Sequence, residues 1–238
     1  MKSIKEIVDA LLRGSMYSAK EQKRQIDSKL TAKIAESGLG MDVEALEELW
    51  GKRKIPARPP TPSYWYVFLT KLYEDSGSES GVRRALRAPW VAEWLKFDQL
   101  PITIRFIWVR IGSEERFLGE LLGKREVWVL AKKVARSLLE DEGFSTIVAA
   151  GVAHIDEGLR LYRAGVNRAE LFKSYKWAVA LNSYVTARIL EEASKEGVLK
   201  MHEDRLAELR LSLVNSARSY LATLKQKRGE REAELVEA

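Results

Sequence analysis

Apolar residues recur at helical spacing along most of the chain, and glycines stand where helices are expected to end. Serine followed three residues later by glutamate marks helix starts at Ser3 and Ser18. The pattern predicts helices near residues 3–13, 18–37, 42–50, 63–75, 80–87, 89–98, 113–122, 125–142, 145–164, 168–196 and 199–228. The last four helices are long and are joined by short connections, which favours antiparallel neighbours in a four-helix-bundle-like domain. We therefore predict an all-α fold.

Residues 101–111, PITIRFIWVRI, do not fit this pattern. Their β-branched and aromatic side chains favour a strand. No convincing partner strand is visible in the chain, and an unpaired strand leaves backbone N–H and C=O groups unsatisfied. Two alternatives stay open, a buried helix or a strand that pairs with another subunit, and we favour the buried helix.

Four prolines between residues 51 and 62 forbid a regular helix and favour an extended, semi-rigid path. We therefore divide the chain into four regions. Short basic helices occupy residues 1–50, and a proline-rich basic linker follows over residues 51–62. Short helices rich in aromatic residues occupy residues 63–123, and the long-helix bundle occupies residues 124–238.

The composition narrows the class of protein. A hydrophobic fraction of 46% is ordinary for a folded chain, and the absence of cysteine excludes disulfides and thiolate chemistry. No apolar run approaches the ~18 residues of a membrane span, and the first residues lack a signal-peptide core. We expect a cytoplasmic protein, or one within a virion if the chain is viral. Abundant charges with few Asn and Gln favour a source in a hot environment, such as a thermophilic archaeon or its virus.

Positive charge is concentrated in the first 135 residues, which carry the net charge of +6, and it lies beside aromatic and proline residues. A phosphate backbone attracts such a surface. The residues predicted to contact nucleic acid are Lys20, Arg24, Lys52, Arg53, Lys54, Arg58, Arg83, Arg84, Arg87, Arg125, Lys132, Lys133 and Arg136.

The helix that begins near Arg125 carries the most regular part of this set. Arg125, Lys132 and Arg136 fall on the face opposite its apolar positions, with Lys133 beside them. At ~1.5 Å rise per residue this row spans about 16 Å, enough for several phosphates. The alternative is an ordinary solvated face. Likewise, the aromatic residues at 64–66 offer either base-stacking surfaces or the core of a short helix.

Helix 168–196 is apolar on both faces. Such a helix either lies at the centre of its domain or binds a second subunit. The residues predicted for self-association are Lys173, Trp177, Leu181, Tyr184 and Arg188.

No phosphate-binding loop, dinucleotide fingerprint, nucleophile elbow or metal-ligand motif is present in the sequence. We therefore predict no catalytic residues, no metal and no cofactor. The leading hypothesis is a non-enzymatic protein that binds duplex DNA through its backbone, without sequence preference, and assembles with itself for packaging or coating. The alternatives are a helical protein–protein scaffold without nucleic acid, and an enzyme whose site is not visible as a motif.

Overall fold

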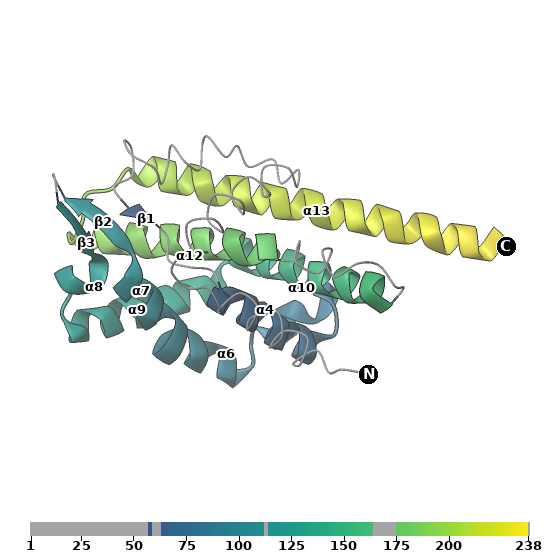
Figure 1. Cartoon of the computed structure of the whole chain (residues 1–238), viewed down its shortest axis with the longest axis horizontal. Coiled ribbons are helices and arrows are strands. Elements are labelled where there is room, and N and C mark those ends of the chain that lie inside the picture. Colours follow the sequence, from purple (N-terminus) through teal and green to yellow (C-terminus); the bar gives the residue numbers. More distant parts are fainter. Residues whose placement is uncertain (1–56, 59–62, 112–113, 164–174, 238) are drawn as a thin grey trace.

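The computed structural model describes residues 57–58, 63–111, 114–163 and 175–237, and helices make up most of this part (Figure 1), which confirms the all-α class. The short helical elements are α4 (Ser63–Ser76), η1 (Glu79–Gly81), α5 (Val82–Ala85), α6 (Pro89–Trp94), η2 (Leu95–Gln99), α7 (Leu100–Phe106) and α8 (Leu118–Leu121). The long helices are α9 (Lys124–Glu140), α10 (Glu142–Arg163), α12 (Tyr175–Lys195) and α13 (Glu203–Glu237). Three short strands, β1 (Ala57–Arg58), β2 (Trp108–Ile111) and β3 (Glu114–Phe117), form an antiparallel sheet in the order β1-β2-β3.

Helix α12 lies at the centre of the long helices. Helices α4, α9, α10 and α13 all pack against it, and α10 and α13 pack against each other. Apolar side chains on both of its faces are buried, including Trp177, Leu181 and Val185 at 0% exposure. A helix that is apolar all round needs cover on every side, and these four neighbours supply it.

A single hydrophobic core joins the predicted regions 63–123 and 124–238. The ring of Trp65 in α4 meets Phe68 and Trp94 edge to face at centroid distances of 5.7 and 5.9 Å, and Phe68 stacks on Trp94 at 4.8 Å. Phe144 of α10, in the region 124–238, also contacts the rings of Trp65 and Phe68. Of the aromatic residues that follow the linker, Trp65 and Tyr66 are therefore core residues rather than stacking surfaces.

Local sequence explains where the helices end. Gly77 and Gly197 follow the last residues of α4 and α12 with φ of 68° and 74°, the left-handed conformation that glycine adopts without steric cost. Between α9 and α10, the Oδ1 atom of Asp141 accepts hydrogen bonds from the backbone N–H groups of Gly143 and Phe144 at 2.8 and 3.3 Å. This side chain caps the first turn of α10, whose N–H groups have no partner within the helix.

Residues 101–111 are part helix, as we favoured, and part strand, but the strand pairs within the chain and not with another subunit. They continue a helix as far as Phe106 and then form β2. The expectation that the chain holds no partner strand is wrong, because β3 pairs with β2 directly, with Trp108 opposite Phe117 and Ile111 opposite Glu114. Residues 114–117 are therefore a strand and not the start of a helix over 113–122. Gly112 and Ser113, which separate the two strands in the sequence, lie outside the described residues.

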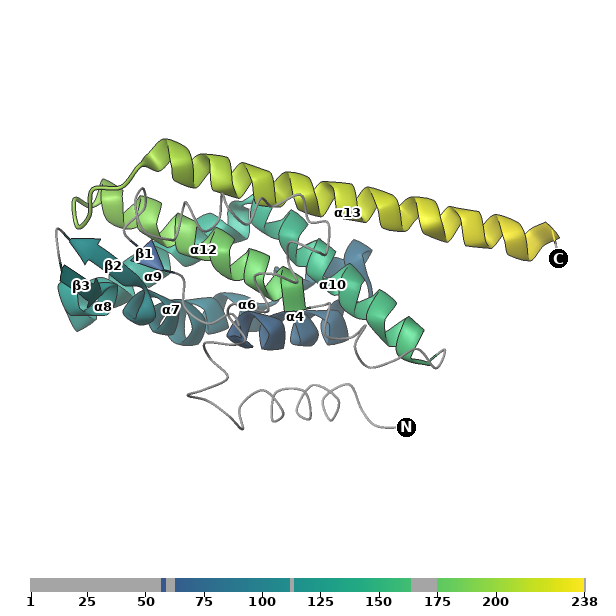
Figure 2. The ribbon, with the colours of Figure 1, turned by 45° about the horizontal axis from the view of Figure 1, so that its top comes forward.

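The sheet lies at the end of the molecule where α12 finishes and α13 begins (Figure 1). Helix α13 runs from there along α12 and α10, and its last turns extend past the other helices (Figure 2). Among the side chains of α13 whose burial is described, up to residue 230, Leu224 is the last buried apolar one. The outer surfaces of α9, α5 and the sheet remain as candidates for binding.

Candidate nucleic-acid interface

Helix α9 presents a basic outer face, as its sequence predicts. Its apolar stripe, which includes Val127, Ala131 and Val134, is buried against the core. On the opposite side Arg125, Lys132 and Arg136 are exposed, and none of the three forms an ion pair or hydrogen bond with any residue that the structure describes. These cations are therefore free to meet an anion from solvent.

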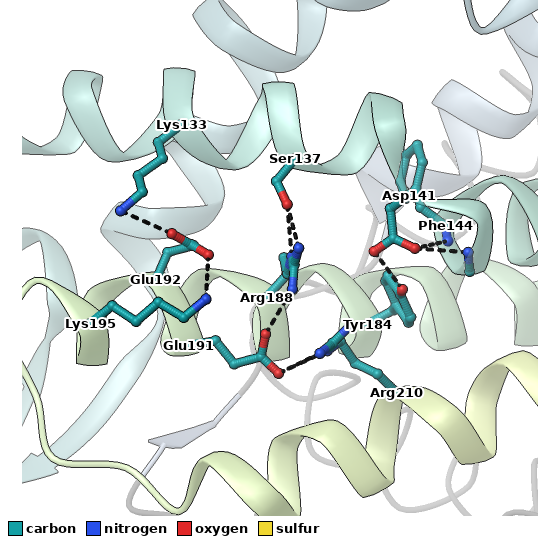
Figure 3. Close-up of polar contacts among 11 residues, drawn as sticks. Lys133, Ser137, Asp141, Phe144, Tyr184, Arg188, Glu191, Glu192, Lys195 and Arg210 are labelled. Atoms are coloured by element: carbon teal, nitrogen blue, oxygen red, sulfur yellow. Dashed lines mark hydrogen bonds and ion pairs between the residues drawn. The ribbon is translucent and has the colours of Figure 1, made fainter.

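Lys133, the fourth predicted residue of this helix, has a different environment. Its Nζ atom lies 3.1 Å from Glu192 Oε2 (Figure 3) and 2.5 Å from Glu196 Oε1, and both carboxylates belong to the C-terminal end of α12 and the residues just after it. Hydrogen bonds to Glu196 and Glu192 raise the pKa of Lys133 above its ordinary value. A phosphate would have to compete with these two carboxylates, so Lys133 is a weaker candidate than Lys132.

The three predicted arginines of residues 83–87 lie on and just after α5, and all are exposed. Arg83 is 3.5 Å from Glu142, but both side chains are more than three-quarters exposed, so this pair contributes little to stability. It does place α5 beside the start of α10, which directly follows α9. Arg84 and Arg87 have no partner among the described residues.

The remaining predicted contacts belong to the front of the chain. Lys20, Arg24, Lys52, Arg53 and Lys54 lie outside the described residues. The backbone of Arg58 belongs to β1, where it is directly opposite Trp108 of β2.

The face of α12 predicted for self-association is turned into the protein. Trp177 and Leu181 are 0% exposed and Tyr184 is 2% exposed. The open alternative, a helix central in its domain, therefore applies to these residues. The Trp177 ring centroid lies 5.1 Å from that of Tyr220 in α13, and the Tyr184 hydroxyl donates to Asp141, just after α9. Arg188 also points inward, and Lys173 lies outside the described residues.

Arg188 belongs to a polar network between α9, α12 and α13 (Figure 3). Its Nε atom donates to Ser137 Oγ at 3.0 Å, and its Nη1 atom donates to Glu191 at 3.1 Å. The other oxygen of Glu191 accepts from Arg210 of α13 at 2.9 Å. Glu191 is 5% exposed, so its charge depends on these two arginines.

Tyr184 extends the network toward α10. Its hydroxyl donates to Asp141 Oδ2 at 2.7 Å, while Asp141 Oδ1 caps α10. Burial first, and then the hydrogen bond to Asp141, raise the pKa of Tyr184. The Tyr184 hydroxyl is held on a carboxylate, and the Glu191 carboxylate is held between two arginines. These contacts join α9, α12 and α13.

A shallow pocket adjoins this network, between α12 and α13. Its volume is about 200 Å³, below the roughly 300–1,000 Å³ of typical small-molecule sites. Its lining residues are Tyr184, Ala207, Arg210, Leu211, Val214 and Arg218. Of its two arginines, Arg210 is already paired with Glu191, whereas Arg218 has no ion pair with the described residues.

Two exposed aromatic groups are absent from the predicted site residues. At the hairpin, Trp108 lies against Phe117 and Phe117 meets Phe106 edge to face, with centroid distances of 3.9 and 5.8 Å. Beside α9, Phe97 of η2 is 51% exposed and its ring centroid lies 5.9 Å from that of Trp128. Sequence patterns do not distinguish these rings from core residues, because both helices and strands also bury their aromatic side chains.

Within the described ranges, no group of three or more His, Asp and Glu side chains is placed to hold a metal ion. In the same part of the chain, no helix combines the length and the apolar character needed to cross a bilayer. Comparisons with protein-family models, curated proteins and solved structures find no match for this chain. The functional assignment therefore depends on the exposed charges and rings themselves.

Proposed function

We propose that the protein binds nucleic acid without catalysing a reaction, through phosphate contacts along the outer face of α9. The observation that carries this proposal is the row formed by Arg125, Lys132 and Arg136, which is exposed and has no carboxylate partner among the described residues. Unpaired cations bind phosphates without first breaking an ion pair inside the protein. Releasing the counterions of the nucleic acid then supplies favourable free energy.

Arg84 and Arg87 would add to the same surface, because α5 packs against α10, which directly follows α9. Contacts to the backbone carry no sequence information. The proposal is therefore sequence-independent binding, which suits a protein that coats or packages duplex DNA in a cell or a virion.

A salt series on a labelled duplex tests this proposal. Replacing Arg125, Lys132 and Arg136 together by Gln should reduce the slope of log K against log salt by about 0.9 for each phosphate that the variant no longer neutralises. The protein should remain folded, because changes of exposed side chains usually alter the unfolding free energy by no more than about 0.5 kcal/mol.

A matched control is available on α13. Arg218, Lys225 and Lys227 are exposed and have no ion pair with the described residues. Replacing these three by Gln removes the same total charge from another helix. If both triple variants lower the slope equally, binding follows net charge alone, and the assignment to α9 is wrong.

The hairpin favours a second candidate function, a protein scaffold that assembles with itself. Phe106, Trp108 and Ile111 are 54%, 39% and 47% exposed, and β3 has a neighbouring strand on only one side among the described strands. Exposed apolar groups beside a free strand edge are typical of association surfaces. A Trp108→Glu variant should then sediment as a smaller species than the wild-type protein. An unchanged sedimentation coefficient would exclude Trp108 from such a contact.

A further inference from the structure

The basic face of α9 is bordered by two aromatic rings. Phe97 lies in η2, a short π-helical stretch between α6 and α7, and Trp128 lies in α9. Their ring centroids are 5.9 Å apart with an angle of 47° between the planes. Trp128 is partly buried, whereas Phe97 is 51% exposed. The pair therefore presents ring surface to solvent.

The exposure of Phe97 is not required by the packing around it. Leu95 and Leu100 fill the core on either side of this turn, at 0% exposure. Gln99 is also buried and donates to Thr103 within the helix at 3.2 Å. The large apolar side chain at position 97 thus points away from the core, although burying it would stabilise the fold. Short π-helical insertions of this kind are frequent at functional sites.

Positive charge surrounds Trp128 on the surface of α9. Lys124, Arg125 and Lys132 stand four residues before, three residues before and four residues after it, the spacings that make neighbours on a helix. All three are exposed and have no ion pair with the described residues. An anionic chain that follows these cations would therefore pass beside the aromatic pair.

We propose that Phe97 and Trp128 form a stacking site for an unpaired base of a nucleic acid strand whose phosphates lie along α9. This inference rests on the proposed function and specifies the ligand, because only single-stranded or locally opened nucleic acid exposes the face of a base. Aromatic rings stack on any base, so the contact adds affinity without sequence preference. The flanking cations favour this occupant over a second copy of the chain, which itself carries net positive charge.

The test compares two labelled strands of equal length, one of oligothymidine and one with the same backbone and no bases. The Phe97→Leu variant keeps an apolar side chain but removes the ring, and Phe97→Trp restores a ring. We expect Phe97→Leu to weaken oligothymidine binding by about five-fold to a hundred-fold, and Phe97→Trp to recover it. Neither variant should change the affinity for the abasic strand.

Phe106→Leu is the matched control, because Phe106 at the hairpin is exposed to nearly the same extent, 54% against 51% for Phe97. It should leave the affinity for both strands unchanged. If Phe97→Leu and Phe106→Leu lose affinity equally, the stacking site is overturned. It is also overturned if Phe97→Leu loses as much affinity for the abasic strand as for oligothymidine.

Other results separate this inference from the proposed function. If Phe97→Leu binds oligothymidine like the wild type while the α9 triple variant binds both strands more weakly, the stacking site is excluded and the phosphate row stands. If the wild-type protein binds neither strand nor duplex, the proposed function itself fails. If Phe97→Leu instead dissociates an oligomer in sedimentation, the ring pair is a contact between copies, and the inference is overturned.

Discussion

Lys132 and Lys133 are consecutive residues of α9, yet their surroundings differ. Lys133 is held by Glu192 and Glu196, whereas Lys132 faces solvent with no ion pair to any described residue. The same contrast divides the whole helix. Its inner margin contacts charged residues of α12 through Lys133 and Ser137, and its outer face carries charges that have no ion pair with any described residue. A basic residue in the sequence is therefore a candidate for binding an anion only if it does not already form an ion pair within the fold.

If the inner network holds the helices together, removing its most buried member should have the largest effect on stability. Replacing Glu191 by Ala leaves Arg188 and Arg210, each about one-fifth exposed, without their shared carboxylate. We expect the unfolding free energy to fall by about 3 kcal/mol. Urea denaturation measures this loss, and a change below about 0.5 kcal/mol would show that the network is not important for stability.

The next effect concerns the junction of α9 and α10. Replacing Asp141 by Ala removes the cap of α10 and the acceptor of the Tyr184 hydroxyl. We expect the unfolding free energy to fall by about 2 kcal/mol, roughly half from the cap and half from the buried hydrogen bond. The Tyr184→Phe variant removes only the hydrogen bond and should lose about 1 kcal/mol in the same urea titration. Equal losses in the two variants would mean that the cap contributes nothing.

A smaller effect on stability is expected at acidic pH, from Glu192. Burial alone would raise the pKa of Glu192, but hydrogen bonds from Lys195 and Lys133 and their charges lower it below its ordinary value of 4.5. The lowered pKa contributes stability that is fully present above about pH 4.5 and is lost as the pH falls through the folded-state pKa. Melting temperatures across an acid series should therefore fall less steeply for Glu192→Gln than for the wild type. The exposed Glu140→Gln variant, as a control, should keep the wild-type slope.

The smallest expected effect on stability comes from Lys132 and Lys133. These adjacent lysines also allow the most direct comparison of the two faces of α9. Lys133→Met should lower the unfolding free energy by about 0.5 kcal/mol at low salt, since its side chain is 45% exposed. Lys132→Met should leave stability unchanged but reduce the salt slope of DNA binding by about 0.9. If Lys133→Met reduces the slope as much as Lys132→Met, the division between inner and outer charges is wrong.

Periodicity in the sequence predicts the long helices well. The predicted helix over 125–142 is Lys124–Glu140 in the structure, and the one over 145–164 is Glu142–Arg163. The outer position of Arg125, Lys132 and Arg136 follows from the same periodicity. Each of these predictions depends on residues three or four apart in the chain, so local spacing contains the information.

Local spacing in the sequence does not predict the β2–β3 pairing or the ion pairs between α9 and α12, for two reasons. Residues 114–117 contain two adjacent glutamates and an arginine, which resemble the start of a helix until their pairing with β2 is known. Strand formation depends on such cross-strand partners more than on intrinsic preference. Glu192, in turn, lies far along the chain from the Lys133 that it pairs with, at a separation where sequence spacing is uninformative.

The sequence by itself determined the helical class, the long C-terminal helices and the basic outer face of α9, because each is a repeating local pattern. Only the tertiary structure decided which charges stay free and which apolar face is covered. Trp177 and Tyr184 could equally have met a second subunit, but their contacts with Tyr220 and Arg210 of α13 and with Asp141 after α9 bury them within one chain. That choice depends on contacts between distant segments, where the area removed from water sets the free energy.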